Sequence, residues 1–353
     1  MDALNQRVSE AISSRSGALA ADAVALEFLR HPHLEKRFGK TVPEKLLQDT
    51  GFHFDYLAQA IAAGSVDLYL DYIGWAKVLL ANLGVPPMYL ATTLESMRDA
   101  LRAMLAPELS DVACPYLEET LQGFPQMPEE VPSFIAKGNP LPVQYLQALL
   151  RGESQAANKL IMDAIEGGMP VQDIYLEVFE RTQHEIGRLW QVNEISVAQE
   201  HYCTAATQQI MARLYPHIFR EEKTRGTLVA TCVSGDLHEV GARMVCDFFE
   251  LDGWDTHYLG ANVPAATVVQ SLVECRATML AISATITSHV RAVAVLIALV
   301  RSTPECEGVK ILVGGYPFKV EPELWKTIGA DGSANGAREA IELANRLTHV
   351  VAA

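Results

Sequence analysis

The stretch TLVATCVSGDLHEVG, residues 227–241, decides the fold class of the C-terminal part of this chain. It begins with a short run of apolar and β-branched residues, which is typical of a buried strand. A polar loop with one glycine follows, and the residues after it return to the apolar spacing of a helix. A buried strand that leads through a loop into a helix is the repeating unit of an α/β domain with a parallel sheet.

The same pattern of strand, loop and helix recurs toward the C-terminus. Further strands are predicted within THYLGANVP, TMLAISAT, VKILVGG and ADGSANG, at residues 256–264, 278–285, 309–315 and 330–336. Five strands that alternate with helices favour the flavodoxin-like, doubly wound order. Ligands of such sheets bind beyond the carboxyl ends of the strands. We therefore expect residues 223–353 to form one α/β domain with its site at that edge.

The residues before this domain show helical spacing and no strand-like alternation. Residues 1–123 are predicted to form a globin-like packing of helices. Residues 124–142 are rich in proline, which precludes a continuous helix or a central strand, and we interpret them as a linker. Residues 143–222 contain four helical patterns, and Ser196 with Gln199 fits a capping box at the last of them. They predict a small four-helix bundle.

Composition excludes several classes of function. The 353 residues carry a formal net charge of −15, which argues against a nucleic-acid-binding surface. None of the six cysteines forms a CxxC pair, as expected for a reduced cytosolic chain. The apolar runs are too short to span a membrane, and the N-terminus has no signal pattern. We expect a cytoplasmic protein with neither nucleic-acid nor membrane partners.

The loops at the predicted strand ends carry the residues that can do chemistry. Asp236 and His238 follow the first strand, and an aspartate in that position can orient the imidazole toward a metal. One histidine is too few for a protein-held zinc ion, but it suffices for a metal already held in a macrocycle. Glycines would leave room for a flat ligand beside the backbone. Candidates for this are Gly241, Gly314 and Gly315, with Ser283 and Thr285 between them.

The motif D-x-H-x-x-G, followed by a serine and then Gly-Gly, resembles the cobalamin-binding domain of methionine synthase, the mutases and the corrinoid proteins. The resemblance implies that His238 binds cobalt from below in place of dimethylbenzimidazole, with Asp236 orienting it. It also implies a slot in the sheet for the nucleotide tail of cobalamin. The residues implied to line this slot are Ser283, Thr285, Gly314 and Gly315, and the preceding bundle would cover the upper face.

The bundle contains LWQVNEISVAQEH, residues 189–201, in which Trp190 is followed by Glu200 and His201. This W-x9-E-H pattern resembles the adenosylcobalamin-dependent, light-responsive repressors. The resemblance implies an indole wall against the adenosyl group and hydrogen-bonding groups for its ribose and adenine. In those repressors a histidine directly follows the tryptophan, whereas this chain has Gln191.

The N-terminal helices resemble the globin-like sensor regions that precede such cobalamin domains, as in the photocobilins, which add a bilin to adenosylcobalamin. A bilin such as biliverdin needs aromatic walls and polar groups near its pyrrole nitrogens. We predict His53 and Tyr56 as bilin contacts. Other candidate neighbours in this region are His31, His33, Tyr72 and Trp75.

The resemblances together imply a photoreceptor that binds adenosylcobalamin and a bilin, and that signals rather than catalyses. The sequence shows no kinase, cyclase or DNA-binding segment, so we expect the signal to pass to a partner protein or through a homo-oligomer such as a dimer. The alternative is a corrinoid protein that carries methyl groups between methyltransferase partners. A regulatory scaffold that senses another ligand through its N-terminal domain is the third possibility.

Overall fold

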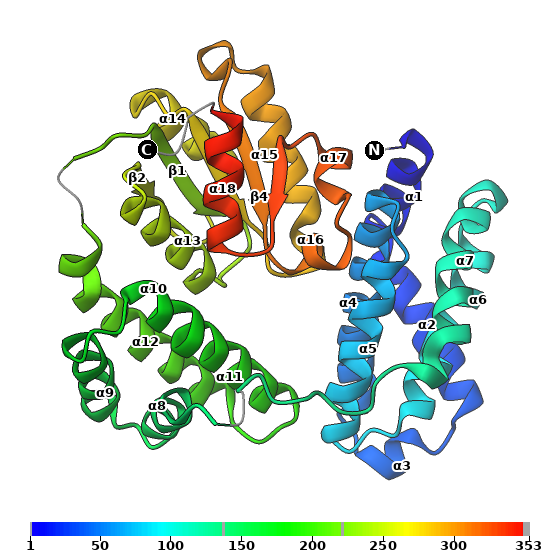
Figure 1. Cartoon of the computed structure of the whole chain (residues 1–353). Helices are drawn as coiled ribbons and strands as arrows, with labels where there is room; N and C mark the ends of the chain where they lie inside the picture. The colour runs from blue at the N-terminus through cyan, green and yellow to red at the C-terminus, as the bar shows by residue number, and fades with distance from the viewer. Residues whose placement is uncertain (1, 136–137, 220–221, 349–353) are drawn as a thin grey trace. The chain divides into compact units, whose positions relative to one another are not determined.

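The computed structural model describes residues 2–135, 138–219 and 222–348, and Figure 1 shows the whole chain. Residues 136–137 of the predicted linker, residues 220–221 of the predicted bundle and residues 349–353 lie outside the described residues. The chain divides into two compact units. One contains the residues up to Glu129 together with Ala284–Ile297 and Tyr316–Gly329, and the other contains the remainder.

The N-terminal region is helical from Ala3 to Gly123, as predicted. The long helix α4 packs against α1 and α2, and its buried side chains include Phe54, Leu57 and Ile61. Gly64 ends α4 in the left-handed conformation, at φ 73°, which glycine adopts at little cost. The helices are α1 Ala3–Ser13, α2 Ser16–Arg30, α3 Leu34–Phe38, α4 Val42–Ala63, α5 Asp67–Asn82, α6 Pro87–Met104 and α7 Pro107–Gly123.

The predicted linker begins with a short 3-10 turn, Phe124–Gln126. The Lys77 side chain holds this turn, because its Nζ donates to the carbonyls of Phe124 at 3.2 Å and Met127 at 3.0 Å. The linker ends earlier than predicted, since α8 begins at Pro140 and not at residue 143. Proline is accepted in the first turn of a helix, where its missing N–H leaves no intrahelical bond unmade.

The C-terminal half of the linker also contacts the bundle. The Glu185 side chain, which is only 6% exposed, accepts a 2.8 Å hydrogen bond from the Phe134 amide. Arg188 donates to the same carboxylate through Nε at 3.0 Å and Nη2 at 2.8 Å. The rings of Phe134 and His184 lie 5.3 Å apart, and Ile135 packs against the bundle core. The segment before α8 is therefore attached to the helix that also carries Trp190.

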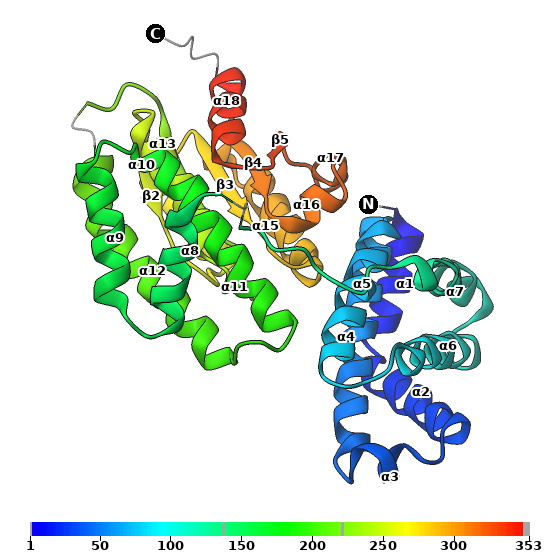
Figure 2. The same cartoon turned by 60° about the horizontal axis from the view of Figure 1, so that its bottom comes forward.

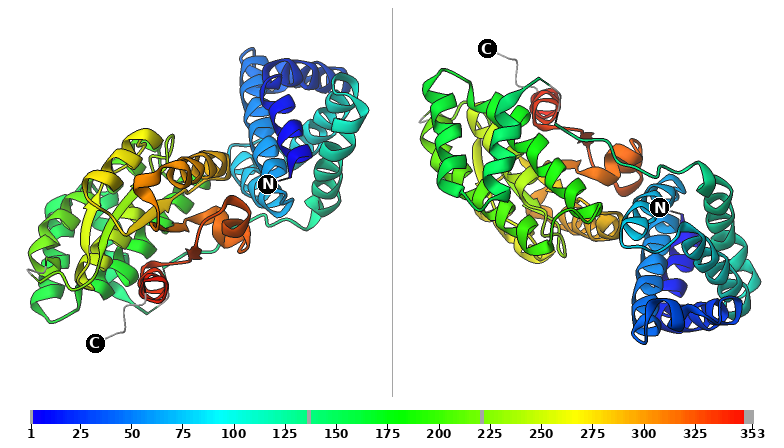
Figure 3. Two further views of the ribbon diagram at one scale, coloured as in Figure 1. Left: turned by 90° about the horizontal axis from the view of Figure 1, so that it is seen from above. Right: turned by 90° about the horizontal axis from the view of Figure 1, so that it is seen from below.

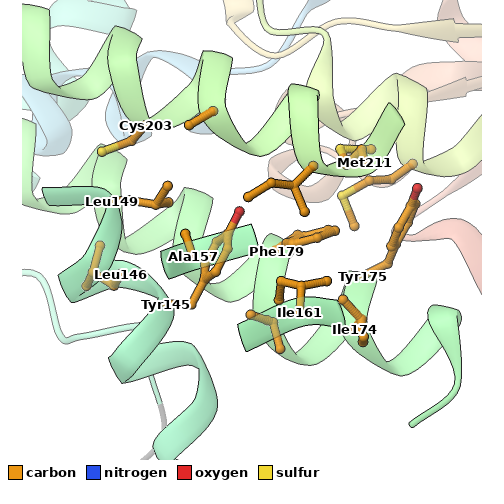
Figure 4. Packing of buried hydrophobic residues seen from close by; sticks show 14 of the residues in the cluster. Tyr145, Leu146, Leu149, Ala157, Ile161, Ile174, Tyr175, Phe179, Cys203 and Met211 are labelled. Atoms are coloured by element: carbon orange, nitrogen blue, oxygen red, sulfur yellow. The ribbon is translucent and has the colours of Figure 1, made fainter. Parts of the chain in front are cut away.

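The bundle has the four predicted helical segments, grouped as Figure 2 shows. The third of these segments is one continuous helix from Val171 to Gln191, but its middle part is π-helical and not α-helical. Tyr145, Phe179 and Ile161 point toward one another in the core of the bundle (Figure 4). The elements are α8 Pro140–Leu150, α9 Ser154–Glu166, α10 Val171–Asp173, the π-helix Ile174–Glu180, α11 Arg181–Gln191 and α12 Val197–Ile218.

The C-terminal domain contains a five-stranded parallel sheet in the order β2-β1-β3-β4-β5, which confirms the predicted doubly wound fold. Figure 3 shows the sheet between α14 on one side and α18 on the other. The strands are β1 Thr227–Cys232, β2 Asp255–Tyr258, β3 Met279–Ser283, β4 Lys310–Gly314 and β5 Gly332–Ala334. The helices between and after them are α13 Val240–Leu251, α14 Ala265–Glu274, α15 Val290–Ser302, α16 Tyr316–Val320, α17 Leu324–Ile328 and α18 Ala337–Leu347.

The core on one face of the sheet joins α13 and α18 to the strands. Trp254 and Phe249 are fully buried there, with their ring centroids 5.4 Å apart. Within residues 2–135, 138–219 and 222–348, no helix is both long and apolar enough to cross a membrane.

Candidate functional site

Asp236 and His238 lie in the loop between β1 and α13, at the carboxyl edge of the sheet. Asp236 is fully buried, and its Oδ1 accepts a hydrogen bond from the His238 amide at 2.9 Å. The same oxygen lies 2.8 Å from His238 Nδ1, while the imidazole is 60% exposed. A proton on Nδ1 that is shared with Asp236 leaves the lone pair of Nε2 available on the exposed side. The pair thus presents one oriented imidazole that can bind a metal.

The hydrogen bond that the imidazole donates to Asp236 raises the pKa of His238, against the opposing effect of burial. The charge of Glu200, from the bundle, also contributes to this rise. The carboxylate of Glu200 is therefore close enough to act electrostatically on the imidazole. The 2.8 Å contact from Gln208 of α12 to Glu239 likewise brings α12 to the His238 loop.

The loop after β2 forms hydrogen bonds with the His238 loop. The sequence did not predict this contact. The side-chain oxygen of Asn262 accepts a hydrogen bond from the Gly235 amide at 2.7 Å. The backbone amide of Asn262 donates a hydrogen bond to the Asp236 carbonyl at 3.0 Å. Asn262 has a φ of 53°, and asparagine is one of the few residues that adopt this conformation readily. The signal that could have found it is its position in YLGANVP, just beyond a strand end.

The sheet brings the predicted slot residues to one edge. In the strand register Cys232 pairs with Ser283, and Ser283 pairs with Gly314. A Cβ atom on Gly314 would lie 3.2 Å from the Ala334 carbonyl, and Gly315 follows with a φ of 109°. Both positions therefore require glycine for reasons within the sheet. Thr285 lies two residues beyond the end of β3.

Gly241 differs from these glycines, because nothing lies within 4 Å of where its Cβ would be. It occupies the first turn of α13, where glycine is less favourable than alanine by about 1 kcal/mol. No neighbouring protein atom explains the glycine. The open space beside it lies close to His238 along the chain, so it fits a ligand that approaches this end of the helix.

Trp190 and Glu200 lie on successive helices of the bundle. Trp190 is half-buried at the end of α11 and packs against the bundle core. The predicted capping box is confirmed, since Ser196 and Gln199 exchange hydrogen bonds at the start of α12. Glu200 is hydrogen-bonded to His201 and accepts a hydrogen bond from Thr204 Oγ1 at 3.0 Å. The His201 side chain is 75% exposed, so it lies on the solvent side of Glu200.

Polar contacts join the bundle to the α/β domain. Tyr175 donates to the buried Asp247 of α13 at 2.8 Å, and Arg338 of α18 pairs with Asp173 at 3.0 Å. A further contact is next to the imidazole, where Gln208 of α12 donates to Glu239 at 2.8 Å. Met244, Phe248 and Ala337 of the α/β domain also belong to the bundle core. These contacts hold the bundle along α13, from Glu239 just after His238 to Phe248 near the other end of the helix.

The predicted bilin residues form an aromatic stack between α4 and α5. Tyr56 lies parallel to Tyr72 with ring centroids 3.6 Å apart, and Trp75 stacks on Tyr72 at 6.3 Å. His53 is 5% exposed, and its Nδ1 lies 2.8 Å from the Tyr72 hydroxyl. The structure therefore brings four of the candidate residues together.

His31 and His33 belong to a second cluster, centred on Tyr89. His33 Nε2 lies 3.2 Å from the Tyr89 hydroxyl, and the His31 and Tyr89 rings are 5.1 Å apart. Arg37 donates to the same hydroxyl at 3.3 Å and lies over the Tyr89 ring. The two histidines thus have aromatic partners other than the stack around Tyr72.

Burial lowers the pKa of His53 to about 4. An unfolded chain binds a proton at this residue from about pH 6.5 downward, whereas the folded chain does not. We expect the free energy of local unfolding of α4 and α5 to fall by up to about 3 kcal/mol between pH 6.5 and pH 4. A His53→Leu variant should lack this fall. Hydrogen exchange of α4 and α5 peptides in both full-length proteins measures this. An equal pH dependence in the two proteins would show that His53 is not the group responsible.

Comparison with known proteins agrees with this division of the chain. Residues 143–215 and residues 226–342 match two family models, each described as a B12 binding domain. Residues 3–124 match a model described as phycobilisome protein, which supports a bilin-type domain at the N-terminus. The matched ranges correspond to the bundle, the α/β domain and the N-terminal helices.

Curated relatives are corrinoid proteins. Corrinoid protein DSY3155 of Desulfitobacterium hafniense is 26% identical over 206 residues, which cover 57% of this chain and 94% of that protein. Dimethylamine corrinoid protein 3 of Methanosarcina mazei is 30% identical over 123 residues, which cover 35% of this chain and 72% of that protein. The chain spans 58% of the length of some other dimethylamine corrinoid proteins.

A solved structure shares the fold of the bundle and the α/β domain. The monomethylamine corrinoid protein of Methanosarcina barkeri superposes with a TM-score of 0.51 at 23% identity, over 59% of this chain and 96% of that chain. The part of the chain that the structure describes holds no group of three or more His, Cys, Asp or Glu side chains placed to bind a metal ion. The matched domains and the identity to these relatives show that the chain belongs to the family of corrinoid-binding proteins.

Proposed function

We propose that this protein is a light sensor that binds adenosylcobalamin, with His238 as the lower ligand of cobalt. The observation that carries the proposal is the polar side of α12, where Glu200 is held by Thr204 and Gln208 donates to Glu239, the residue after His238. An adenosyl group offers hydroxyl and amino groups to such side chains, whereas a methyl group offers none.

The residues present fit cobalamin. His238 offers Nε2 on its exposed side, and the buried Asp236 fixes the orientation of the ring. The open space at Gly241 accommodates a ligand beside the start of α13. In this proposal the nucleotide tail lies along the sheet edge, with the adenosyl group under the bundle. The tail contacts are Ser283, Thr285, Gly314 and Gly315, and the adenosyl contacts are Trp190, Glu200 and His201.

When bound, adenosylcobalamin supplies a cobalt–carbon bond that light can cleave. The bundle would cover the upper ligand of cobalt, and loss of that ligand would change the conformation of the bundle. Trp190 ends a helix that is also attached to the linker through Glu185. A movement of this helix would therefore reach the linker, and from there a signalling partner or the second subunit of a homodimer in the cytoplasm.

The N-terminal domain is proposed to bind a bilin such as biliverdin against the aromatic stack. Support comes from the match of residues 3–124 to the phycobilisome model and from the parallel rings of Tyr56 and Tyr72. His53 lies edge-on to Tyr72 and remains neutral at physiological pH, because burial lowers its pKa to about 4. A neutral imidazole can accept or donate a hydrogen bond at its second nitrogen.

A second candidate function is a methyl carrier for methyltransferase partners. It is favoured by the curated relatives, which include dimethylamine corrinoid proteins. A carrier of this kind must expose the upper face of cobalamin to its partners. Transfer of a methyl group from the methylcobalamin-loaded protein to a thiol through an added methyltransferase would support this function over the sensor.

Absorption spectroscopy of protein produced with both cobalamin and biliverdin tests the proposed cofactors. We expect the cobalamin bands to remain with the protein through gel filtration in the dark, together with a far-red band from the bilin. A protein that elutes with cobalamin and without the far-red band would restrict the proposal to cobalamin. Elution without either would contradict it.

An Asp236→Asn variant tests the orienting carboxylate. We expect cobalamin affinity to fall by about 10-fold, because a neutral amide supports the basicity of the imidazole less well than a carboxylate. Equilibrium dialysis with hydroxocobalamin measures the change. Asp255→Asn is the control, since Asp255 lies 3.6 Å from His257 on β2 in a similar pair. Equal affinities for the two variants would contradict the assigned role of Asp236.

A further inference from the structure

A chain of hydrogen bonds runs through the bundle from Glu200 to Tyr145. Thr204 Oγ1 lies 3.0 Å from Glu200 Oε1 and 3.2 Å from Gln183 Oε1. Gln183 Nε2 donates to Thr207 Oγ1 at 2.9 Å, and this hydroxyl lies 3.0 Å from the Tyr145 hydroxyl. The chain therefore connects three helices, α8, α11 and α12.

The inner end of this chain of hydrogen bonds lies in the apolar core of the bundle. Thr207 and Tyr145 are 0% exposed, so an unpaired hydroxyl at either position would cost about 1–3 kcal/mol. The Gln183 amide lies between the two threonine hydroxyls and contacts both of them. Side-chain hydrogen bonds that are attached to such a buried end restrict the positions of the partly buried members outside it. The network thus fixes the position of Thr204, and Thr204 fixes the Glu200 carboxylate.

The network also relates the two helices that carry the proposed upper-face residues. Gln183 and Trp190 are seven residues apart on α11, which places them on the same side of that helix two turns apart. Glu200 and Thr204 are one turn apart on α12. A bridge from Gln183 to Thr204 therefore sets how Trp190 and Glu200 lie relative to each other.

We propose that Thr204 and Gln183 are positioning residues that make the site select adenosylcobalamin over cobalamins with a small upper ligand. This inference rests on the proposed adenosylcobalamin site. Neither side chain needs to touch the cofactor, because each acts by holding Glu200 in place. Their loss should weaken binding of the adenosyl form and leave the lower ligand, His238, unaffected.

The test measures binding of adenosylcobalamin and methylcobalamin to the full-length apoprotein in the dark. A Thr204→Val variant keeps the size of the side chain and removes the hydroxyl, whereas Thr204→Ser keeps the hydroxyl. We expect Thr204→Val to bind adenosylcobalamin about 10-fold more weakly, as for a lost hydrogen bond to a charged group, with methylcobalamin affinity unchanged. Thr204→Ser should retain the selectivity of the wild type.

A second pair of variants tests the same network in case Thr204→Val fails to fold. Gln183→Met removes the amide at similar length, and we expect the same loss of selectivity. The exposed Gln209 of α12 provides the matched control, Gln209→Met, which should behave as wild type.

The outcomes separate the inference from the proposed function. A wild-type protein that binds both cobalamins equally would contradict the adenosylcobalamin site itself. A selective wild type whose Thr204→Val and Gln183→Met variants remain selective would overturn the positioning role alone. Variants that lose both cobalamins equally would also overturn it, because the network would then be needed only for the fold of the bundle.

Discussion

A His238→Ala variant should lose imidazole coordination of cobalt and bind cobalamin on the order of 100-fold more weakly. His238 is the exposed imidazole whose Nδ1 is paired with a buried carboxylate, so no other part of the loop can replace its Nε2. Removal of a metal ligand costs more than removal of its orienting partner, which typically costs 10–100-fold. Equilibrium dialysis gives the affinity. The absorption spectrum of any bound cobalamin should show either its own benzimidazole or water in the lower position.

The matched control for this variant is His257→Ala. His257 lies on strand β2 and also has an aspartate beside it, Asp255 at 3.6 Å, but it lies within a strand rather than in the loop after one. We expect this variant to bind cobalamin as the wild type does. Retention of a protein imidazole on cobalt in His238→Ala would show that another histidine is the ligand.

A Glu185→Leu variant should destabilise the bundle by about 3 kcal/mol, as expected when one partner of a buried ion pair is removed. It leaves Arg188, whose side chain is 15% exposed, without its carboxylate, and it leaves the Phe134 amide without an acceptor. Burial alone would raise the pKa of Glu185, but the hydrogen bonds from Arg188 and the Phe134 amide outweigh it and lower the pKa. The stabilisation is therefore present above the ordinary pKa of about 4.5 and is lost as the pH falls further.

Hydrogen exchange of peptides from α11 and from residues 130–135 measures this effect in the full-length protein. Glu177→Leu is the control, because Glu177 pairs with Arg181 at 2.8 Å in an exposed pair on the same continuous helix. Exposed pairs of this kind contribute less than about 1 kcal/mol. Equal protection in Glu185→Leu and Glu177→Leu would show that the linker contact does not stabilise α11.

The fold of the α/β domain could be predicted because strands such as β1 and β4 are short and apolar and lead into loops that contain glycine. Leu228 and Ile311 lie in such runs, and both are fully buried. The change to a π-helix at Ile174–Glu180 could not be predicted from local sequence. Tyr175 lies in this stretch and donates to Asp247, which is 72 residues away. A contact over such a distance depends on how the bundle meets α13 and leaves no periodic pattern in the sequence.

The candidate site was predictable to the extent that its residues follow strand ends. Asp236, Ser283 and Gly314 could be assigned to one edge because parallel strands end on the same side. The contact between Gln208 and Glu239 and the bridge made by Gln183 join different elements. Their residue types are common on helix surfaces, so only the packing of the helices shows that they have partners. Asn262 was missed for a similar reason, since its role depends on a neighbouring loop.

The measurement that tests the central claim most directly is the absorption spectrum of the adenosylcobalamin-loaded protein before and after green light. The proposed sensor requires that the bound adenosyl form respond to light, so we expect the spectrum to change on illumination and the dark sample to stay constant. The position of Gln191 beside Trp190 makes the form of the illuminated spectrum informative, because no histidine stands there. An unchanged spectrum in a protein that has bound adenosylcobalamin would contradict the light-sensing function.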